Sequence, residues 1–594
     1  MAGRSRYGWY GHSGHPETPL DAADAGLFTK RQTGVSSGCF QIGCGDSLSD
    51  LCDRLQNPVD YHSGGYPDDS GADSLLLSAV RKNPELSELV GSPAGMDVSA
   101  VGGRGAAAGF SDYLGRMALL RNMVRTRFCV AVFCAAGLLL SAPAPGLTEA
   151  CGPAGTNAYA LHRLGITGRG VSIGLLSAGT VRQSHIAFER KEGSAVSLYD
   201  FTGGGFAPSW HDTHIAGIIL SGGSPSHPDQ IGAAPGAVLH SARISNKQIT
   251  SAYITDALDE LIFNKNCRII LTGLQITHDS VQPDGSSIWT KIYDYYADTY
   301  DVLFINAAGN SCPQITIFGD SYNGLTIDGL VKDQTGRFGK IGSISNRGPT
   351  LDGRKKPELA APTQDLLVPT STGDDHWTGL DPNGLGLTSY AIPHAAAAAA
   401  LLLEAAGKTP QADDDKTEVL KAVLVNAADA AAFQLRSGQL SPTDSITQWK
   451  PDGGYGRLDA LRAYHILTAG PIAKDLPNSR QQGWAYALIE AGQQHQYGLE
   501  AKKGRRLVIT LTWHRKLQRI SNRFYEEPDR FYLDLKIQSP SGKMLVFETP
   551  GRNNLIKTDC VLPETGRYAV ILKNPTAASQ RDYGLAFELL EPAE

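Results

Sequence analysis

The chain has 594 residues, of which 41% are hydrophobic and 19% charged, and its formal net charge is −6. This length is too great for a single hydrophobic core, so we expect two or more domains. The apolar content excludes a disordered chain, and the slightly negative charge without a basic block argues against a nucleic-acid partner. Nine cysteines are scattered without a Cys-x-x-Cys pair, so a structural zinc site is not expected.

Residues 123–146 have the layout of a secretory signal peptide. Basic residues precede the apolar run Phe128–Leu140, and Ala142 and Ala144 supply a small-x-small cleavage pattern. The apolar run is short for a bilayer-spanning helix.

A signal peptide belongs at the N-terminus, so two interpretations of this segment are open. Either Met123 or Met117 is the true start, or the segment is an internal anchor behind a cytoplasmic extension. In both cases we expect residues 1–122 to form a poorly ordered extension, because they are rich in Gly, Ser, Asp and Arg and have few periodic apolar stretches.

From Thr156 onward, patterns typical of strands and helices alternate along the chain. Alternation of this kind predicts an α/β fold, a parallel sheet with helices on both faces. Ligands bind such sheets at the carboxyl ends of the strands. The predicted strands cover residues 171–176, 237–244, 268–274 and 302–307, and the predicted helices cover 252–264, 290–300 and 393–407.

Three segments carry residues suited to nucleophilic catalysis. Residues 211–217 read His-Asp-Thr-His-Ile-Ala-Gly, residues 307–310 read Ala-Ala-Gly-Asn, and residues 387–394 read Leu-Thr-Ser-Tyr-Ala-Ile-Pro-His. In their order and spacing, these segments resemble the motifs of the subtilase family of serine proteases. Weaker matches in the same order are Thr167–Val171, Gly232–Pro235, Ser345–Pro349 and parts of 352–362. The resemblance implies a subtilisin-like peptidase domain over residues 150–470.

The resemblance assigns His211 as general base, Ser389 as nucleophile and Asn310 as a donor to the oxyanion. A serine hydroxyl is a poor nucleophile until a positioned imidazole takes its proton. The tetrahedral intermediate carries an oxyanion that an amide donor stabilises. Ser389 also precedes a helix, where the free N–H groups favour negative charge.

One member of the family's catalytic triad is missing. The first strand of the family's fold ends in an aspartate, and Ser177 occupies that position here. Loss of the aspartate is expected to slow turnover, because a serine supplies no charge to the imidazole. Asp200 is a candidate acid from another segment, and Asp212 is interpreted as a surface substitution for a glycine.

The substrate cleft is also expected to differ from the family's. Gln275 has a long side chain where the family's substrate edge has glycine, and Leu387 replaces a glycine two residues before the nucleophile; both are expected to narrow the cleft. The resemblance assigns substrate binding to Gly273, Leu274, Gln275, Ala307 and Gly309. The segment between the signal peptide and Thr156 leaves no room for the family's usual propeptide.

Three further residue-level predictions concern residues outside these roles. His214 and His394 are expected to be structural. Cys267 precedes one predicted strand and Cys312 follows the next, so they should lie at opposite ends of the sheet and form no disulfide with each other.

After residue 472, short alternating or apolar runs separated by turn signals predict an all-β sandwich over residues 472–594. This region resembles the jelly-roll domains that follow some bacterial subtilase domains, and its expected job is to stabilise the catalytic domain, with binding of a polymer or surface as the alternative. Calcium is the one cofactor with a candidate ligand, Asp534.

The sequence therefore predicts an exported serine endopeptidase that acts on polypeptides, is secreted or located in the cell envelope, and meets the membrane only through its signal peptide. The alternative is a catalytically impaired pseudoprotease that keeps the fold to bind peptides or partners. A serine hydrolase of another specificity is a third hypothesis.

Overall fold

The computed structural model describes residues 146–591, except 247, 277–280, 431–447, 522 and 528–530. The predictions for residues 1–122 and for the signal peptide lie outside the described residues, apart from Gly146. That residue begins helix α5 (Gly146–Ala150), whose Leu147 is fully buried.

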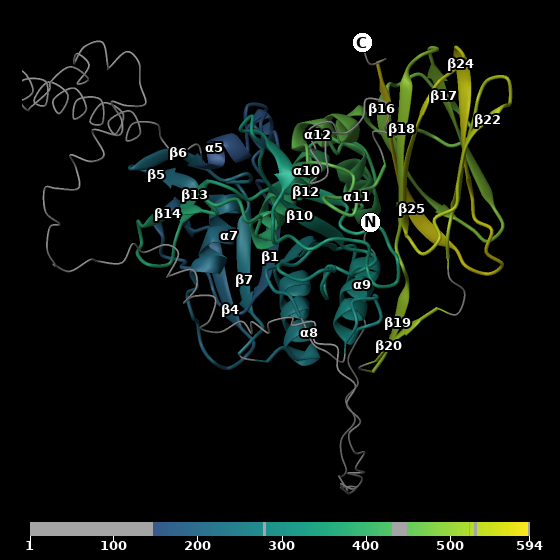
Figure 1. Ribbon diagram of the computed structural model, residues 1–594. Coiled ribbons are helices and arrows are strands. Elements are labelled where there is room, and N and C mark those ends of the chain that lie inside the picture. The colour runs from purple at the N-terminus through teal and green to yellow at the C-terminus, as the bar shows by residue number, and fades with distance from the viewer. Residues whose placement is uncertain are drawn as a thin grey trace, which may run out of the picture. The chain divides into compact units, whose positions relative to one another are not determined.

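The first part of the described chain is built on an eight-stranded sheet (Figure 1). The strand order is β11-β10-β9-β8-β1-β7-β4, with β12 also paired to β10, and only the β10–β11 pair is antiparallel. The α/β prediction is confirmed, and the four predicted strands correspond to β1, β7, β8 and β9. The strands are β1 Ser172–Ser177, β4 Val196–Asp200, β7 Val238–Arg243, β8 Ile269–Thr272, β9 Leu303–Ala307, β10 Leu325–Lys332, β11 Phe338–Ile341 and β12 Leu359–Pro362.

Helices cover both faces of this sheet because the side chains of each buried strand alternate between two apolar clusters. Ile173 and Leu175 of β1 pack with α7, α10, α11 and α12, whereas Leu176 packs with α8 and α9. In Figure 1, α10, α11 and α12 lie toward the top and α8 and α9 toward the bottom. The helices are α7 Trp210–Leu220, α8 Ser251–Asp259, α9 Ile288–Tyr300, α10 Ile392–Ala406, α11 Thr417–Asn426 and α12 Ala460–Ala469.

Helix α10 is the central core helix. Its run of alanines is buried, and the small side chains let it approach β1, β8, β9, β10 and β12 closely. Among the described residues, the stretch Thr388–Ala406 is long and apolar enough to cross a membrane, but 94% of it is buried inside the protein. Its hydrophobicity is therefore explained by the core.

Smaller elements surround this core. They are helices α6 Ala158–His162, η1 Ile186–Phe188, η2 Glu260–Asn264 and η3 Thr388–Tyr390, and the strand pairs β2 Glu189–Arg190 with β3 Gly193–Ser194, β5 Gly222–Ser224 with β6 His227–Ile231, and β13 Leu366–Pro369 with β14 Trp377–Leu380.

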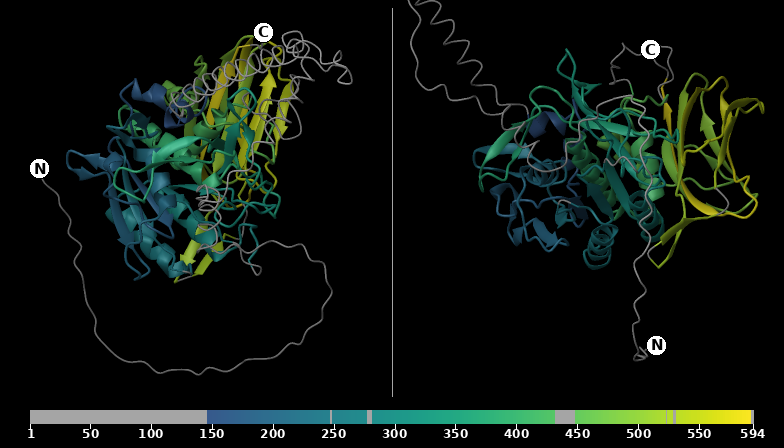
Figure 2. Two further views of the ribbon diagram at one scale, coloured as in Figure 1. Left: turned by 60° about the vertical axis from the view of Figure 1, so that its left-hand side comes forward. Right: turned by 60° about the horizontal axis from the view of Figure 1, so that its bottom comes forward.

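The C-terminal part forms two sheets that pack face to face (Figure 2). One sheet has the order β15-β17-β24-β21-β22 and the other β16-β25-β18-β23, with all pairs antiparallel except β15–β17. The predicted sandwich is confirmed as a strand-rich region of antiparallel sheets, and its jelly-roll topology stays a prediction. Its strands are β15 Pro477–Asn478, β16 Gln482–Ile489, β17 Gln494–Ala501, β18 Arg506–Trp513, β21 Asp534–Gln538, β22 Met544–Glu548, β23 Leu555–Val561, β24 Gly566–Lys573 and β25 Arg581–Leu590.

Strand β18 shows how the sandwich meets the rest of the protein. Alternate residues point to opposite faces of a strand. Leu507, Ile509 and Leu511 enter the sandwich core, while Thr510 Oγ1 donates to Asn426 Oδ1 (3.0 Å) and Thr512 Oγ1 donates to the carbonyl of Glu418 (2.9 Å). Both acceptors belong to α11, so this helix lies directly on the sheet.

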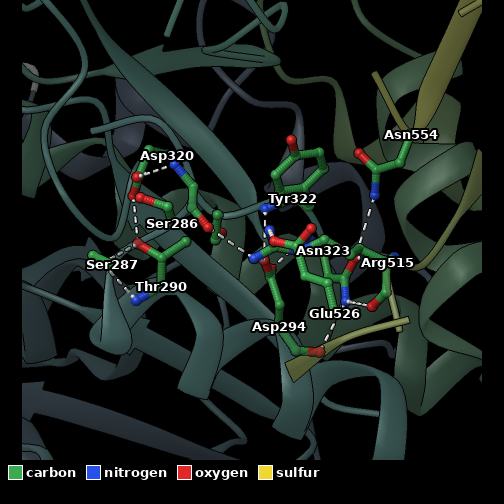
Figure 3. Close-up of polar contacts among 12 residues, drawn as sticks. Ser286, Ser287, Thr290, Asp294, Asp320, Tyr322, Asn323, Arg515, Glu526 and Asn554 are labelled. Atoms are coloured by element: carbon green, nitrogen blue, oxygen red, sulfur yellow. Dashed lines mark hydrogen bonds and ion pairs between the residues drawn. The ribbon is translucent and has the colours of Figure 1, made fainter. Parts of the chain in front are cut away.

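A polar cluster joins the two parts beside α9 (Figure 3). Arg515, just after β18, places its guanidinium 2.5 Å from Asp294 Oδ2, and the Asp294 side chain is fully buried. The main-chain N–H of Arg515 donates to Asn323 Oδ1 (2.7 Å), and Asn323 Nδ2 donates back to the Arg515 carbonyl (2.8 Å). The ring of Tyr322 lies 4.2 Å from the Arg515 guanidinium carbon. The hairpin β19 (Leu517–Ile520) and β20 (Arg523–Glu526) continues from this point and buries Phe524 against the α8–α9 cluster.

Candidate active site

The predicted catalytic residues lie at the carboxyl edge of the parallel sheet and at the starts of two helices. Ser177 is the last residue of β1, and His211 is the second residue of α7. Asn310 follows β9, and Ser389 is the middle residue of the short 3₁₀ helix η3 that precedes α10. These positions agree with the expectation that a parallel sheet presents its site at the carboxyl ends of the strands.

Ser209 caps the N-terminus of helix α7, and its hydroxyl accepts a hydrogen bond from the N–H of Asp212 (3.0 Å). In a reciprocal capping box, the carboxylate three residues into the helix would accept the N–H of the capping serine. That N–H donates instead to the carbonyl of Thr180 (2.8 Å). The Asp212 carboxylate is therefore not used in capping its own helix.

The Asp212 carboxylate points inward and contacts two residues of the predicted site. Asp212 is 1% exposed, its Oδ1 lies 3.3 Å from His211 Nδ1, and the same oxygen accepts a hydrogen bond from the hydroxyl of Ser177. The prediction that Asp212 is a surface substitution is wrong. Ser177 directs its hydroxyl at Asp212, and among the described residues it shares no hydrogen bond with His211.

Asp200, the other candidate acid, forms hydrogen bonds within the loop that follows β4. One carboxylate oxygen accepts from the N–H and hydroxyl of Thr202 (2.9 and 2.7 Å), and the other accepts the N–H of Gly205 (2.6 Å). Although desolvation opposes it, these hydrogen bonds and nearby Arg243 lower the pKa of Asp200. The structure does not bring Asp200 to His211.

Ser389 comes directly before Tyr390, whose ring neighbours the His211 ring, and Ser389 and His211 share no hydrogen bond among the described residues. Ser389 is 7% exposed, and the ring of its neighbour Tyr390 lies 6.0 Å from the His211 ring. Catalytic hydrogen bonds are often long without substrate and tighten in the complex. Because Nδ1 of His211 faces Asp212, Nε2 is the nitrogen left to accept a proton.

The Asn310 side chain is fixed to the turn that carries Ser389. Its Oδ1 accepts the N–H of Thr388 (2.9 Å) and the Thr388 hydroxyl (3.1 Å), and the N–H of Gly309 donates to the same hydroxyl (3.3 Å). Since Oδ1 is engaged, the Nδ2 group remains as the donor. Gly309 has a φ of +105°, and a Cβ there would collide with the Asn346 amide.

Gln275, on the predicted substrate edge, connects the segments that follow β8 and β9. Its Oε1 accepts the N–H of Asn310 (2.9 Å), so the side chain reaches from the end of β8 to the segment after β9. Gly273 lies beside the imidazole, since a Cβ there would be 3.3 Å from His211 Cε1. Leu274 is buried in the α8–α9 cluster. Leu387 packs with Trp210 against a separate apolar cluster around β13 and β14.

The remaining predictions at the site concern two histidines, a cysteine pair and metal ions. Burial and the neighbouring His211 lower the pKa of His214 to about 3, and its ring nitrogens face Tyr390 Oη (3.2 Å) and Thr370 Oγ1 (3.3 Å). Burial likewise lowers the pKa of His394 to about 3. Cys267 is free and buried, so it forms no disulfide with Cys312, as predicted.

Within the described part of the chain, no three His, Cys, Asp or Glu side chains gather as metal ligands. Asp534, the candidate calcium ligand, accepts a hydrogen bond from Thr549 Oγ1 (3.0 Å).

Sequence reasoning missed Asp212 as a site residue. The signal available in the sequence was a pair of differences from the family motifs. The acid at the end of β1 is absent, and an extra acid stands directly after His211. Each was interpreted separately, because only the fold brings residues 177 and 212 into contact.

Comparison with known proteins identifies the family of this domain. The subtilase family model matches residues 168–461. Serine protease AprX of Bacillus subtilis (strain 168) is 26% identical over 295 residues, which are 44% of this chain and 62% of AprX. Membrane-bound transcription factor site-1 protease of Mus musculus is 24% identical over 323 residues, 52% of this chain and 26% of that protein.

This chain thus spans less than two thirds of the length of either relative. The solved structure of the prenylagaramide maturation protease PagA aligns with 54% of this chain and 98% of its own, at 22% identity and a TM-score of 0.38. Residues 168–461 form a domain of the subtilase family.

Proposed function

We propose that this protein is an exported serine endopeptidase in which Ser389 is the nucleophile, His211 the general base and Asn310 an oxyanion donor. The observation that carries the proposal is the coupling of Asn310 to Thr388, which ties the amide donor to the turn bearing Ser389. Export rests on the signal-peptide layout of residues 123–146. N-terminal sequencing of protein recovered from the culture medium tests export, and full-length protein retained in the cytoplasm contradicts it.

The proposed reaction begins when Ser389 Oγ attacks the carbonyl carbon of a peptide bond. The Oγ–H proton moves to His211 Nε2, an O–C bond forms, and the carbonyl electron pair becomes the oxyanion that Asn310 Nδ2 stabilises. Collapse of this intermediate breaks the C–N bond, and His211 gives its proton to the leaving amine. Water then hydrolyses the acyl ester by the same route and regenerates Ser389.

Cleavage of an unfolded protein tests this function. Denatured casein incubated with the purified full chain should be cut at internal bonds, and the new termini can be identified by mass spectrometry. The Ser389→Ala variant should cut nothing at matched concentration. Casein that stays intact with well-folded protein, while still binding to it, would favour the pseudoprotease alternative.

The Asn310 amide should contribute to the rate rather than to the fold. Asn310→Asp keeps an oxygen to accept from Thr388 but loses the Nδ2 donor, and we expect kcat to fall about 10²–10³-fold. KM and the thermal unfolding midpoint should change little, because the contacts with Thr388 persist. A kcat within about threefold of the parent protein would remove Asn310 from the proposed oxyanion site.

A further inference from the structure

We propose that Asp212, held in place by Ser177, is the positioning residue for the His211 imidazole, so that the chain has a complete acid–base–nucleophile set with its acid on α7 instead of β1. This inference rests on the proposed function, because it concerns how His211 is oriented during that reaction.

The contacts place one carboxylate oxygen between two side chains. Oδ1 of Asp212 faces His211 Nδ1 at 3.3 Å and accepts the hydroxyl of Ser177 at the end of β1. The carboxylate therefore lies next to the position from which the family's aspartate would extend, although its own backbone belongs to a different element. Ser177 orients Asp212, and Asp212 orients the imidazole so that Nε2 is free to accept the proton from Ser389.

The surroundings fit this role better than a capping role. The N–H of Ser209, which a capping carboxylate would use, is bound to the Thr180 carbonyl. Space for the carboxylate exists because residue 179 is glycine: a Cβ there would lie 2.8 Å from Asp212 Oδ2. The start of α7 also favours a negative charge, since the helix dipole is positive there.

The buried Asp212 carboxylate is suited to a positively charged neighbour. The second oxygen, Oδ2, is buried and has no hydrogen-bond partner among the described residues. A buried carboxylate with one unsatisfied oxygen is costly, and a positive charge beside it relieves part of that cost. His211 acquires such a charge when it takes the Ser389 proton. His214, which packs nearby, stays neutral because of its low pKa.

The presence of Asp212 changes the effect expected of a Ser177→Asp substitution. Were the acid absent, Ser177→Asp would restore the family's triad and raise activity by orders of magnitude. With Asp212 present, that substitution brings two carboxylates together in a site where both residues are 1% exposed. Two carboxylates in contact in a buried site repel each other strongly, so we expect Ser177→Asp to lower kcat.

The first part of the experiment removes the charge at constant shape. Asp212→Asn in the full chain should lower kcat about 10⁴-fold with KM nearly unchanged, because the imidazole loses its oriented acceptor. Asp375→Asn is the matched control: Asp375 also neighbours a histidine, His376 (3.8 Å), but its side chain is 79% exposed. That variant should keep parental activity, and circular dichroism should show both variants folded.

The second part moves the carboxylate back to the strand. Asp212→Gly alone should be as impaired as Asp212→Asn, and adding Ser177→Asp to it should recover at least about 10²-fold in kcat. If Asp212 had only a structural role, the double variant would not recover activity, because the second substitution at this packed site would lower stability further. If Asp212→Gly does not fold, the isosteric Asp212→Asn variant still decides the question.

The outcomes separate this inference from the proposed function. An Asp212→Asn variant within tenfold of the parent overturns the inference and leaves the endopeptidase proposal standing. If the parent itself neither cleaves casein nor reacts with a serine-directed probe, the proposed function fails. In that case the Nδ1 proton of ¹⁵N-labelled His211, detected by NMR in the parent and shifted in Asp212→Asn, still tests whether Asp212 holds the ring; an unchanged signal overturns the inference.

Discussion

Replacing His211 by alanine is expected to lower kcat on the order of 10⁶-fold while leaving the fold intact. The physical reason is that His211 is the proposed base for the Ser389 proton, and neutral serine is a weak nucleophile. A loss of this size occurs in subtilisin, a member of the same family. His211 is about a quarter exposed and lies at the start of α7, so its removal leaves no large cavity.

The measurement is kcat for a chromogenic peptide with His211→Ala, Ser389→Ala and the double variant. Residues that act as one unit are not additive, so the double variant should be about as active as either single variant. A second, independent loss in the double variant would contradict a shared proton-transfer step. A matched control is His376→Ala, because that imidazole is 59% exposed and lies beside a carboxylate.

Replacing Arg515 by alanine is expected to lower the free energy of unfolding by about 3 kcal/mol. Removing one partner of a buried ion pair leaves the other charge without compensation. Asp294 is fully buried, and among the described residues its carboxylate also accepts the N–H groups of Tyr322 (3.2 Å) and Asn323 (2.8 Å). The variant also loses the stacking of the guanidinium on Tyr322.

The measurement is a urea titration of the full chain, followed both by intrinsic fluorescence and by residual peptidase activity. Because Arg515 joins the sandwich to α9, both signals should shift together. Arg567→Ala is the control, since Arg567 and its partner Glu500 are 60% and 41% exposed, and exposed pairs contribute less than about 1 kcal/mol. Equal midpoints for Arg515→Ala and the parent would contradict a structural role for the sandwich.

This junction bears on the expected job of the C-terminal region. The sheet β16-β25-β18-β23 lies on α11, and Gly584 is required there because a Cβ would collide with the Glu418 carbonyl. Lys557 reaches across and donates to the Val425 carbonyl (2.8 Å), and burial lowers its pKa to about 7. These contacts support the proposal that the sandwich stabilises the catalytic domain.

Most strands at the centre of the parallel sheet could be predicted from the sequence, whereas β10 could not. β1, β7, β8 and β9 were expected because their side chains are buried on both faces. β10 was missed because Asp328 and Gly329 break its run. Asp328 is fully buried there, and burial raises its pKa to about 7, although the N–H groups of Gly329 and Gly453 donate to it.

The same distinction applies to the candidate site. His211, Asn310 and Ser389 stand in short local motifs, so the sequence alone pointed to them. The contact of Asp212 with Ser177 joins residues 35 positions apart, and the pairing of Arg515 with Asp294 joins residues 221 positions apart. A carboxylate at a helix start is usually exposed, and only the arrangement of β1 and Gly179 turns this one inward.

Reaction with a fluorophosphonate probe tests the central claim, that Ser389 is an activated nucleophile, most directly. The folded full chain should gain the mass of one probe, and peptide mapping should place it on Ser389. Labelling should disappear in Ser389→Ala and in denatured protein, because an unactivated serine does not react. A folded chain that gains no mass, or that is labelled equally in Ser389→Ala, would contradict the account.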